Sequence, residues 1–299
     1  MNQHKTQRLL LPVDISEHSV HAIQFARYIG ACFGTELTGI TLLYVAPVSF
    51  MGHRVGYTDF RAEDLKQSEP LRKLSNQYVE DVIKPFMDVG EKMLREAGVK
   101  AAVEKLVVDG DPAHEVVRVA EEGGFTGIIM GRRGLSELKR LFLGSVTSKV
   151  IGHAPCNVLV VEPKSRLEIR HILVATDGSK YSEAAARGAI HLAKCAGAEL
   201  TAVSVVPYEL REEFGAAEGD VMKIKEDAAK EGLSASGLTV SGKPYERIVA
   251  VSKERNIDLI VVGSHGRTGI ERLIMGSVAE RVIILSTCAV LVTKLPRVA

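Results

Sequence analysis

Two short glycine-containing segments, one in each half of the chain, have the residue types of a phosphate-binding loop. The first runs from Gly131 to Gly134 and is followed, nine residues later, by Gly144-Ser145. The second runs from Gly263 to Gly266 and is followed, at the same spacing, by Gly276-Ser277. Glycine lets main-chain N–H groups approach a ligand without a Cβ in the way. Each Gly-Ser pair can begin a helix, whose free N–H groups and dipole favour phosphate oxygens. The pattern therefore predicts two cradles for a polyphosphate.

An aspartate ends the first apolar run of each half. Asp14 follows the run that closes with Pro12 and Val13, and Asp177 follows the run that closes with Thr176. In open parallel sheets, ligands bind beyond the carboxyl ends of the strands, where the winding direction reverses. We therefore expect each aspartate to lie beside the glycine loop of its own half.

The chain repeats itself. The segment from Ile172 to Ser179 restates Leu9 to Ser16 at an offset of 163, and Glu199-Leu200-Thr201 restates Glu36-Leu37-Thr38 at the same offset. From Gly110, which matches Gly242, the offset is 132, a decrease of 31. Self-similarity of this length predicts two tandem domains, 1–163 and 168–299, which we call the first copy and the second copy. The first copy should carry a longer insert at about 47–90.

Apolar runs and helical spacing alternate within each copy. The expected strands of the first copy are 8–13, 37–45, 103–108, 127–130 and 158–161. Those of the second copy are 171–176, 200–206, 237–241, 258–262 and 289–293. Such alternation predicts an α/β fold in which each copy is a five-stranded, mainly parallel sheet with helices on both faces. An amphipathic helix is expected at 76–97, with Pro85 as a kink or a helix start.

Composition limits the function classes. The net charge is +1 and Trp is absent, which argues against a nucleic-acid or membrane-surface partner. No run approaches the roughly 20 apolar residues of a membrane span, and the N-terminus lacks a signal-peptide pattern. The four cysteines form no CxxC pair, and they recur at equivalent positions of the repeat. We therefore expect packing cysteines and a cytoplasmic protein.

The loops match the pattern G-x2-G-x9-G-[S/T] twice, and the segment GSHGRTGIERLIMGSVAERV, which begins at Gly263, is close to a family consensus. In these features the chain resembles the universal stress protein family in its tandem form, over nearly its whole length. The resemblance implies Rossmann-like domains of the adenine nucleotide alpha hydrolase type. It also implies ATP as the ligand of both copies and a stress-response role. Pairing of the two domains through their final strands is a further implication, and two chains could pair again as a homodimer.

The resemblance also implies which residues bind the nucleotide. Asp14 and Asp177 would contact the ribose or a magnesium ion on the phosphates, and the main chain of Val45 and Val205 would meet adenine. The first-copy set is Pro12, Val13, Asp14, Val45, Gly131, Arg132, Arg133, Gly134, Gly144, Ser145, Val146 and Thr147. The second-copy set is Thr176, Asp177, Val205, Gly263, Ser264, His265, Gly266, Arg267, Thr268, Gly276, Ser277, Val278 and Ala279.

The two loops differ at their central residues. Arg132-Arg133 in the first copy replaces the Ser264-His265 of the second, which follows the family consensus. The guanidinium groups could strengthen phosphate binding, or they could pair with acids and close the pocket. The basic group that they form with Lys139 and Arg140 is also compatible with nucleic acid, but a phosphate loop explains it with fewer assumptions.

Two other functions stay open on the sequence. His265 could act as an acid in slow ATP hydrolysis or autophosphorylation, although Walker-type GKS/T, GxSxG and HExxH motifs are absent. The chain is therefore expected to be at most a weak ATPase, with no assigned catalytic residue. Alternatively, it is a nucleotide-free interaction scaffold whose partner surface is 47–75, a segment that contains Phe50, Met51, Tyr57 and Phe60.

Overall fold

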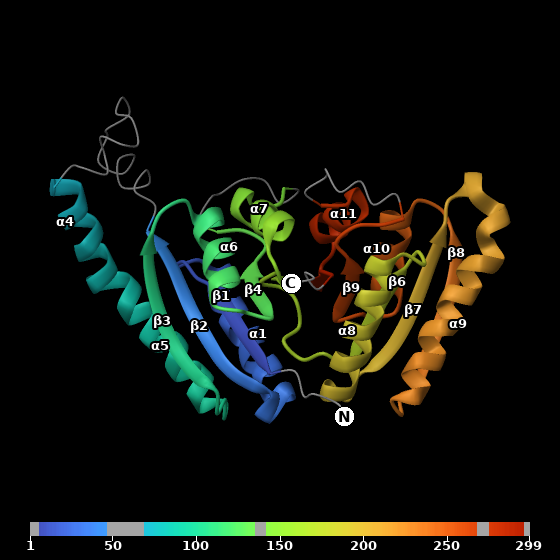
Figure 1. Ribbon diagram of the computed structural model, residues 1–299, viewed down its shortest axis with the longest axis horizontal. Coiled ribbons are helices and arrows are strands. Elements are labelled where there is room, and N and C mark those ends of the chain that lie inside the picture. The colour runs from blue at the N-terminus through green and yellow to red at the C-terminus, as the bar shows by residue number, and fades with distance from the viewer. Residues whose placement is uncertain (1–5, 47–68, 135–141, 268–274, 296–299) are drawn as a thin grey trace.

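The computed structural model describes residues 6–46, 69–134, 142–267 and 275–295 (Figure 1). Strands and helices alternate along each copy, as the sequence predicts. The elements of the first copy are β1 (Gln7–Pro12), α1 (Glu17–Phe33), β2 (Leu37–Ala46), α4 (Glu69–Tyr78), α5 (Lys84–Glu96), β3 (Ala102–Asp109), α6 (Pro112–Glu122), β4 (Gly127–Gly131), α7 (Ser145–His153) and β5 (Asn157–Val161). Those of the second are β6 (His171–Thr176), α8 (Lys180–Ala196), β7 (Glu199–Val206), α9 (Phe214–Lys230), β8 (Ala235–Ser241), α10 (Pro244–Glu254), β9 (Leu259–Gly263), α11 (Ser277–Leu285) and β10 (Ala289–Thr293).

The described strands form one continuous sheet in the order β3-β2-β1-β4-β5-β10-β9-β6-β7-β8. All neighbours within a copy are parallel. The copies meet where β5 pairs with β10 in antiparallel register, with Leu159 opposite Leu291. This arrangement confirms the expected fold class and the expected pairing through the final strands. In each copy the strand order reverses beside β1 or β6, where ligands bind in such folds.

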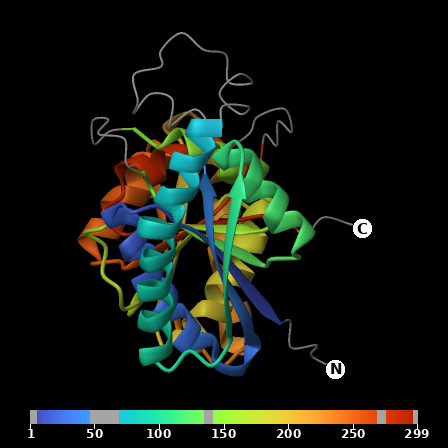
Figure 2. The ribbon, with the colours of Figure 1, turned by 90° about the vertical axis from the view of Figure 1, so that its left-hand side faces the viewer.

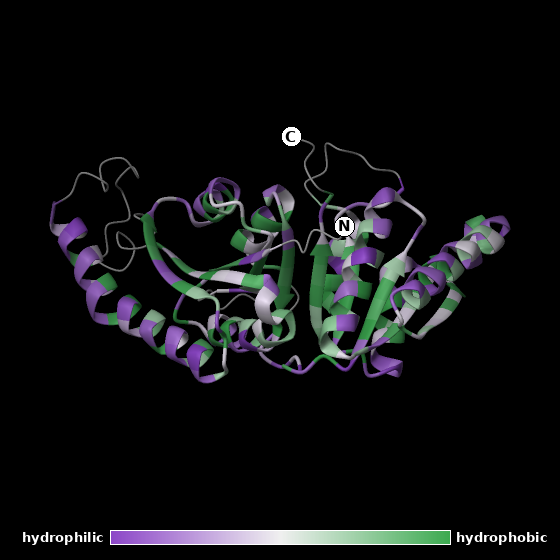
Figure 3. Ribbon diagram, turned by 60° about the horizontal axis from the view of Figure 1, so that its bottom comes forward, coloured by the Kyte–Doolittle hydropathy of each residue, from purple (hydrophilic) through white to green (hydrophobic). Residues whose placement is uncertain are grey.

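Two helical layers cover the sheet, one on each face. Helices α1, α5, α8 and α9 pack on one face, and α6, α7, α10 and α11 on the other. Figure 2 shows α5 and α6 on opposite sides of β2 and β3, and Figure 3 shows apolar strands beneath helices with polar outer surfaces. Each core joins residues of both copies, such as Phe25 with Ala189 on one face and Ile151 with Ile283 on the other.

The repeat is displaced by three residues between the first helix and second strand of each copy. Arg8 pairs with Gly39, whereas its counterpart His171 pairs with Glu199, so the equivalent residues of β2 and β7 differ by 160 and not by 163. A short 3-10 turn at Gly34–Glu36 and a register shift beside Gln7 accommodate the difference. The expected match of Glu36-Leu37-Thr38 with Glu199-Leu200-Thr201 is therefore wrong as a structural alignment.

The helical segment that precedes β3 begins earlier than predicted. Helix α4 passes through a π turn at Val79–Ile83 into α5, and Pro85 lies in the first turn of α5. Proline has no N–H to donate and interrupts regular helical hydrogen bonding, and here it directly follows the π turn, across which Lys84 N donates to Val79 O. Ile83, Met87 and Leu94 are fully buried, which confirms that the apolar side of this segment faces the core.

Cys156 and Cys288 lie at equivalent positions beside the central strands, and both are buried. Burial raises the pKa of each thiol to about 12, because a thiolate would lose its hydration there. These two cysteines therefore pack as small apolar side chains, as expected. In the described part of the chain, no helix is long and apolar enough to cross a membrane.

Candidate functional site

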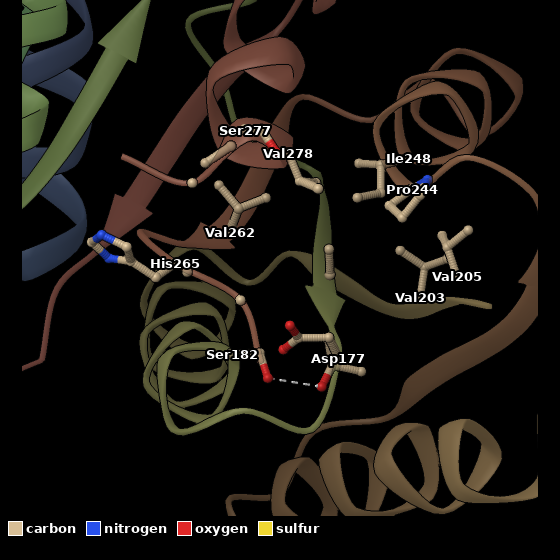
Figure 4. A pocket seen from close by; sticks show the side chains of 16 residues that line it. Asp177, Ser182, Val203, Val205, Pro244, Ile248, Val262, His265, Ser277 and Val278 are labelled. Atoms are coloured by element: carbon tan, nitrogen blue, oxygen red, sulfur yellow. Dashed lines mark hydrogen bonds between the residues drawn. The ribbon is translucent and has the colours of Figure 1, made fainter. Parts of the chain in front are cut away.

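Each copy has a cavity at the carboxyl ends of its strands. The first-copy cavity has a volume of about 330 Å³, and the second-copy cavity, drawn in Figure 4, about 200 Å³. The first is lined by Pro12, Val13, Asp14, Ser19, Leu43, Tyr44, Val45, Pro112, Val116, Met130, Gly131, Arg133, Gly134, Gly144, Ser145, Val146 and Thr147. The second is lined by Ala175, Thr176, Asp177, Ser182, Val203, Val205, Pro244, Ile248, Val262, Gly263, His265, Gly266, Gly276, Ser277, Val278 and Ala279.

The two cavities are built from the same positions of the repeat. Every residue that lines the second cavity has a counterpart that lines the first, at an offset of 163, 160 or 132 according to its element. Asp177 corresponds to Asp14, and Ser277 corresponds to Ser145. Because the side chains differ at several pairs while the positions do not, the backbone of the fold defines the cavity.

The first glycine of each loop is required by packing. A Cβ on Gly131 would lie 2.4 Å from the Cβ of His18, and a Cβ on Gly263 would lie 2.8 Å from the carbonyl carbon of Tyr181. His18 and Tyr181 are equivalent residues in the first turns of α1 and α8. These glycines therefore allow the first helix of each copy to cross closely over the loop, whether or not a ligand is bound.

The last glycine of each four-residue loop brings the main chain onto the aspartate. A Cβ on Gly134 would lie 2.6 Å from Oδ2 of Asp14, and a Cβ on Gly266 would lie 2.8 Å from Oδ2 of Asp177. Both glycines line their cavities. The fold thus places each loop beside the aspartate that ends the first strand, as the sequence predicts.

Helices α7 and α11 begin at the cavities. Gly144 and Gly276 are their N-caps, and neither cap makes a side-chain hydrogen bond. The first main-chain bonds run from Ser148 N to Gly144 O (2.9 Å) and from Glu280 N to Gly276 O (3.1 Å). The N–H groups that precede these bonds belong to the first turn of each helix, beside the cavity wall. Their partial positive charge makes this end of each cavity suited to an anion.

The two aspartates differ in what holds them. Oδ1 of Asp14 accepts hydrogen bonds from Ser16 N (3.0 Å), from Ser19 Oγ (2.6 Å) and from the Ser16 hydroxyl. Asp177 accepts hydrogen bonds from Ser179 N at Oδ1 (3.1 Å) and from Arg267 N at Oδ2 (2.9 Å). Both carboxylates are therefore oriented by the first turn of the following helix, and Asp177 is also bound by the residue after its glycine loop. The equivalent position of the first copy, 135, lies outside the described residues.

Arg267 lies at the edge of the second cavity and does not line it. Its guanidinium donates to the main-chain carbonyl of Asp177 and to the Glu213 carboxylate, and it lies 3.8 Å from a carboxylate oxygen of Asp220. These contacts hold the loop against α9 and the 3-10 turn before it, Tyr208–Glu213. The Arg267 guanidinium is thus occupied by a carbonyl and two acidic residues, and its expected contact with a nucleotide stays a prediction.

Arg132 and Ser264, at the second positions of the loops, also point away from the cavities. Arg132 is 7% exposed, and its Nε lies 2.8 Å from a carboxylate oxygen of Glu162. Of the two expected outcomes for Arg132-Arg133, pairing with an acid is correct for Arg132. Arg133 lines the first cavity, and its Nε donates to the Phe142 carbonyl (3.0 Å).

Most of the apolar part of each cavity was missing from the sequence prediction, which named Val45 and Val205 at the ends of the second strands. It is formed by side chains at the ends of the second and fourth strands and by the start of the helix after the third. The residues missed there are Leu43, Tyr44, Pro112, Val116 and Met130 in the first copy, and Val203, Pro244, Ile248 and Val262 in the second. The match of Gly110-Asp111-Pro112 with Gly242-Lys243-Pro244 at an offset of 132 was the available signal for two of them. The prediction also lacked Ser19 and Ser182, in the first turns of α1 and α8, and Ala175 in β6.

Several expected residues lie outside the described part of the chain. They are Thr268, Lys139, Arg140 and most of the proposed partner segment 47–75. Within the described residues, no group of three or more His, Cys, Asp or Glu side chains could hold a metal ion. Any magnesium at Asp14 or Asp177 would therefore need most of its ligands from elsewhere.

Nearly the whole chain is similar in sequence and in fold to proteins of one family. A model of the universal stress protein family matches residues 5–162 and 168–294. A universal stress protein of Methanocaldococcus jannaschii is 38% identical over 142 residues, which cover 43% of this chain and 84% of that protein. One from Mycobacterium bovis is 30% identical over 208 residues, covering 65% of this chain and 70% of that protein. The crystal structure of a universal stress protein from Archaeoglobus fulgidus matches with a TM-score of 0.75 at 26% identity, covering 98% of this chain and 99% of that one.

Proposed function

The chain belongs to the universal stress protein family, and we propose that each of its two copies binds one molecule of ATP. The protein then acts in the stress response as a nucleotide-binding or nucleotide-sensing module. The single observation that carries this proposal is the duplicated cavity, because the same lining positions recur in both copies and the aspartate, the three glycines and the serine at the helix start are identical in the two. A packing accident would not be expected to preserve a cavity twice.

Each cavity has two chemically different ends, as a nucleotide site requires. Figure 4 shows Val203, Val205, Pro244 and Ile248 together on one side, His265 and Ser277 on the other, and Asp177 between the two groups. The apolar side suits a purine ring, and the start of α11 suits phosphates. Between them, the carboxylate of Asp177 can accept a hydrogen bond from a ribose hydroxyl.

Magnesium fits this site only as a companion of the phosphates. Mg²⁺ is usually held by one or two carboxylates together with phosphate oxygens and waters. Asp14 and Asp177 each offer one carboxylate at the loop. We therefore assign any metal to the nucleotide complex and not to a site built by the protein alone.

The first experiment is to purify the protein without added nucleotide, denature it, and measure the adenine nucleotides released per chain by chromatography. About two ATP per chain is expected, and one would indicate that a single copy retains ATP. Release of ADP instead would point to hydrolysis. If nothing is released and titrated ATP with magnesium does not bind, the proposal fails.

A charge placed at the helix start tests the site itself. Ser277→Asp puts a carboxylate beside the expected phosphates, where two unit charges about 4 Å apart repel by about 4 kcal/mol at an effective dielectric constant of 20. We expect ATP affinity of the second copy to fall at least about tenfold. An acidic residue is favourable in the first turn of a helix, so folding should not suffer.

The matched control is Ser277→Asn, which has a similar size and no charge. Ser145→Asp and Ser145→Asn are the corresponding pair for the first copy. Affinity measured by calorimetry should fall only in the aspartate variants, each in its own copy. Equal affinity in Ser277→Asp and Ser277→Asn would contradict the placement of the phosphates at α11.

A further inference from the structure

Arg132 is a buried cation that belongs to the glycine loop of one copy and contacts a helix of the other. Its Nη1 donates to the main-chain carbonyls of Ile283 (3.3 Å), Ile284 (3.2 Å) and Ser286 (3.2 Å), at the carboxyl end of α11. Its Nε forms the ion pair with Glu162 at the end of β5. The side chain therefore spans the boundary between the two copies, about 150 residues apart in sequence.

The contact between Arg132 and α11 stabilises both the guanidinium group and the end of the helix. The last carbonyls of a helix lack intrahelical partners and carry partial negative charge, and α11 has no basic residue in its own last turn. A buried guanidinium, in turn, is stable only when its charge and its N–H groups are compensated. Burial lowers the pKa of Arg132, and Glu162 opposes this effect only in part. The ion pair with Glu162 and the three carbonyls are the groups that offset the buried charge.

The same residue organises the phosphate end of the first cavity through its main chain. Arg132 N donates to Val161 O (2.9 Å), and Arg132 O accepts from Gly144 N (3.1 Å) at the N-cap of α7. Helix α11, whose end the side chain holds, begins at Ser277 in the wall of the second cavity. One buried residue thus connects the start of α7 at one cavity, through α11, to the other cavity.

In the second copy the equivalent main-chain bonds are present, from Ser264 N to Thr293 O (3.0 Å) and from Gly276 N to Ser264 O (2.9 Å), but the Ser264 side chain bonds within its own loop. Ser264, the counterpart of Arg132, has its Oγ 3.1 Å from Nδ1 of His265. The reciprocal contact comes instead from Lys294, the counterpart of Glu162, whose Nζ donates to Gly152 O in the last turn of α7 (3.1 Å). The loop-to-helix link therefore runs through Arg132 alone among the described residues.

We infer that Arg132 couples the two nucleotide sites, so that ATP in either copy increases the affinity of the other. This inference rests on the proposed function. Phosphates bound in the first copy order its glycine loop, and the loop in turn orders Arg132 and the end of α11. ATP that binds next to the second copy then loses less conformational entropy in ordering α11. Linkage makes the effect reciprocal, and a coupling factor of about five or more is expected. Arg132 is a positioning residue here, since it lines neither cavity.

Calorimetric titration with ATP and magnesium measures the coupling. Ser145→Asp and Ser277→Asp each leave one working site, and together they give the affinity of each site with the other blocked. The wild-type isotherm should show tighter binding than the sum of these two single-site isotherms. In Arg132→Gln combined with Glu162→Gln, which removes both buried charges, each site should still bind but the factor should fall to about one. The control Arg166→Gln removes the exposed arginine of an ion pair with the buried Asp258, away from both loops, and should leave the coupling factor unchanged.

Hydrogen exchange gives a second readout, which reports on α11 itself while the second site is blocked. In Ser277→Asp, ATP can occupy only the first copy, yet amides of α11 should exchange at least about threefold more slowly when ATP is added. The Arg132→Gln/Glu162→Gln background should lose this protection. Arg132→Lys, which keeps the charge, should retain part of it. The coupling would be overturned if the wild-type isotherm equalled the sum of the two single-site isotherms. It would also be overturned if ATP bound to the first copy left hydrogen exchange in α11 unchanged. Either result would leave the proposed function intact. If neither the wild type nor any variant bound ATP, the proposed function would be rejected instead.

Discussion

Single side chains distinguish two sites that share a backbone. Arg132 and Ser264 occupy the same loop position, yet one reaches the opposite copy and the other stays beside its own histidine. Asp14 is held by two serine hydroxyls, whereas Asp177 is held by Arg267. Such differences leave the cavity positions unchanged, so they alter how each site responds to ligand more than where the ligand lies.

His21 provides a test at this scale. It is buried, and its Nε2 lies 3.0 Å from Ser165 Oγ in the segment that joins the copies. Burial lowers the pKa of His21 in the folded protein, whereas the unfolded chain titrates near 6.5. The stability that neutral His21 contributes is therefore present above pH 6.5 and is lost as the pH falls through the lower folded pKa.

We expect His21→Gln to lose less thermal stability than the wild type between pH 7 and pH 5. Burial also lowers the pKa of His18 in the same helix, so part of the pH dependence should remain. Melting temperatures at the two pH values measure the effect. An identical decrease in both proteins would exclude His21 as a contributor.

At the scale of elements, helix α9 covers the outer end of the second copy and contains glycines that nothing in the fold requires. Gly215 and Gly219 have helical backbone angles, and a Cβ on either would meet no atom within 4 Å. In contrast, a Cβ on Gly237 in the adjoining strand β8 would lie 2.4 Å from a methyl group of Val221. Similar residues thus have opposite constraints on two elements that pack together.

Gly219→Ala should stabilise the protein by about 0.5–1 kcal/mol, because alanine has less conformational freedom to lose in a helix. Gly237→Ala should destabilise it, because Val221 must move. Chemical denaturation of the two variants measures both free energies. A loss of stability in Gly219→Ala would show that α9 differs from the helix described here.

The whole molecule is organised by the seam between β5 and β10. This antiparallel pair merges two sheets into one, and each hydrophobic core includes side chains of both copies. Tyr28 in α1 donates to Ile169 O, and Lys294 N donates to Asn157 Oδ1, so hydrogen bonds also cross between the copies. The two copies should therefore unfold together.

Leu291→Ala removes a buried side chain at the seam, opposite Leu159. Large-to-small changes of this kind cost about 2–5 kcal/mol. Differential scanning calorimetry should show one transition at a lower temperature, with both copies affected. Two separate transitions, of which only one shifts, would mean that the copies are stable independently.

Much of the fold was predictable from sequence because its signals are local. Strands in a parallel sheet are short apolar runs, several helices begin at Ser or Gly-Ser, and both patterns occur twice with an offset that is constant within each element. The glycine loops and Asp14 or Asp177 were predicted to meet because the carboxyl ends of parallel strands share one edge. The limits 1–163 and 168–299 stay a prediction, as does the identity of the ligand.

Tertiary structure alone decided the features that depend on residues distant in sequence. The side chain of Arg132 turns away from phosphate because Glu162 and the end of α11 lie close enough to compensate its buried charge. The three-residue displacement of β2 follows from strand pairing, which comparison of the two sequence repeats does not reveal. Most of the apolar side chains that line each cavity are of the same types as those in the hydrophobic core, so the sequence does not distinguish them. Sequence determined which groups can bind phosphate, and packing determined which of them face the cavity, because direction is set by the neighbours that a side chain meets.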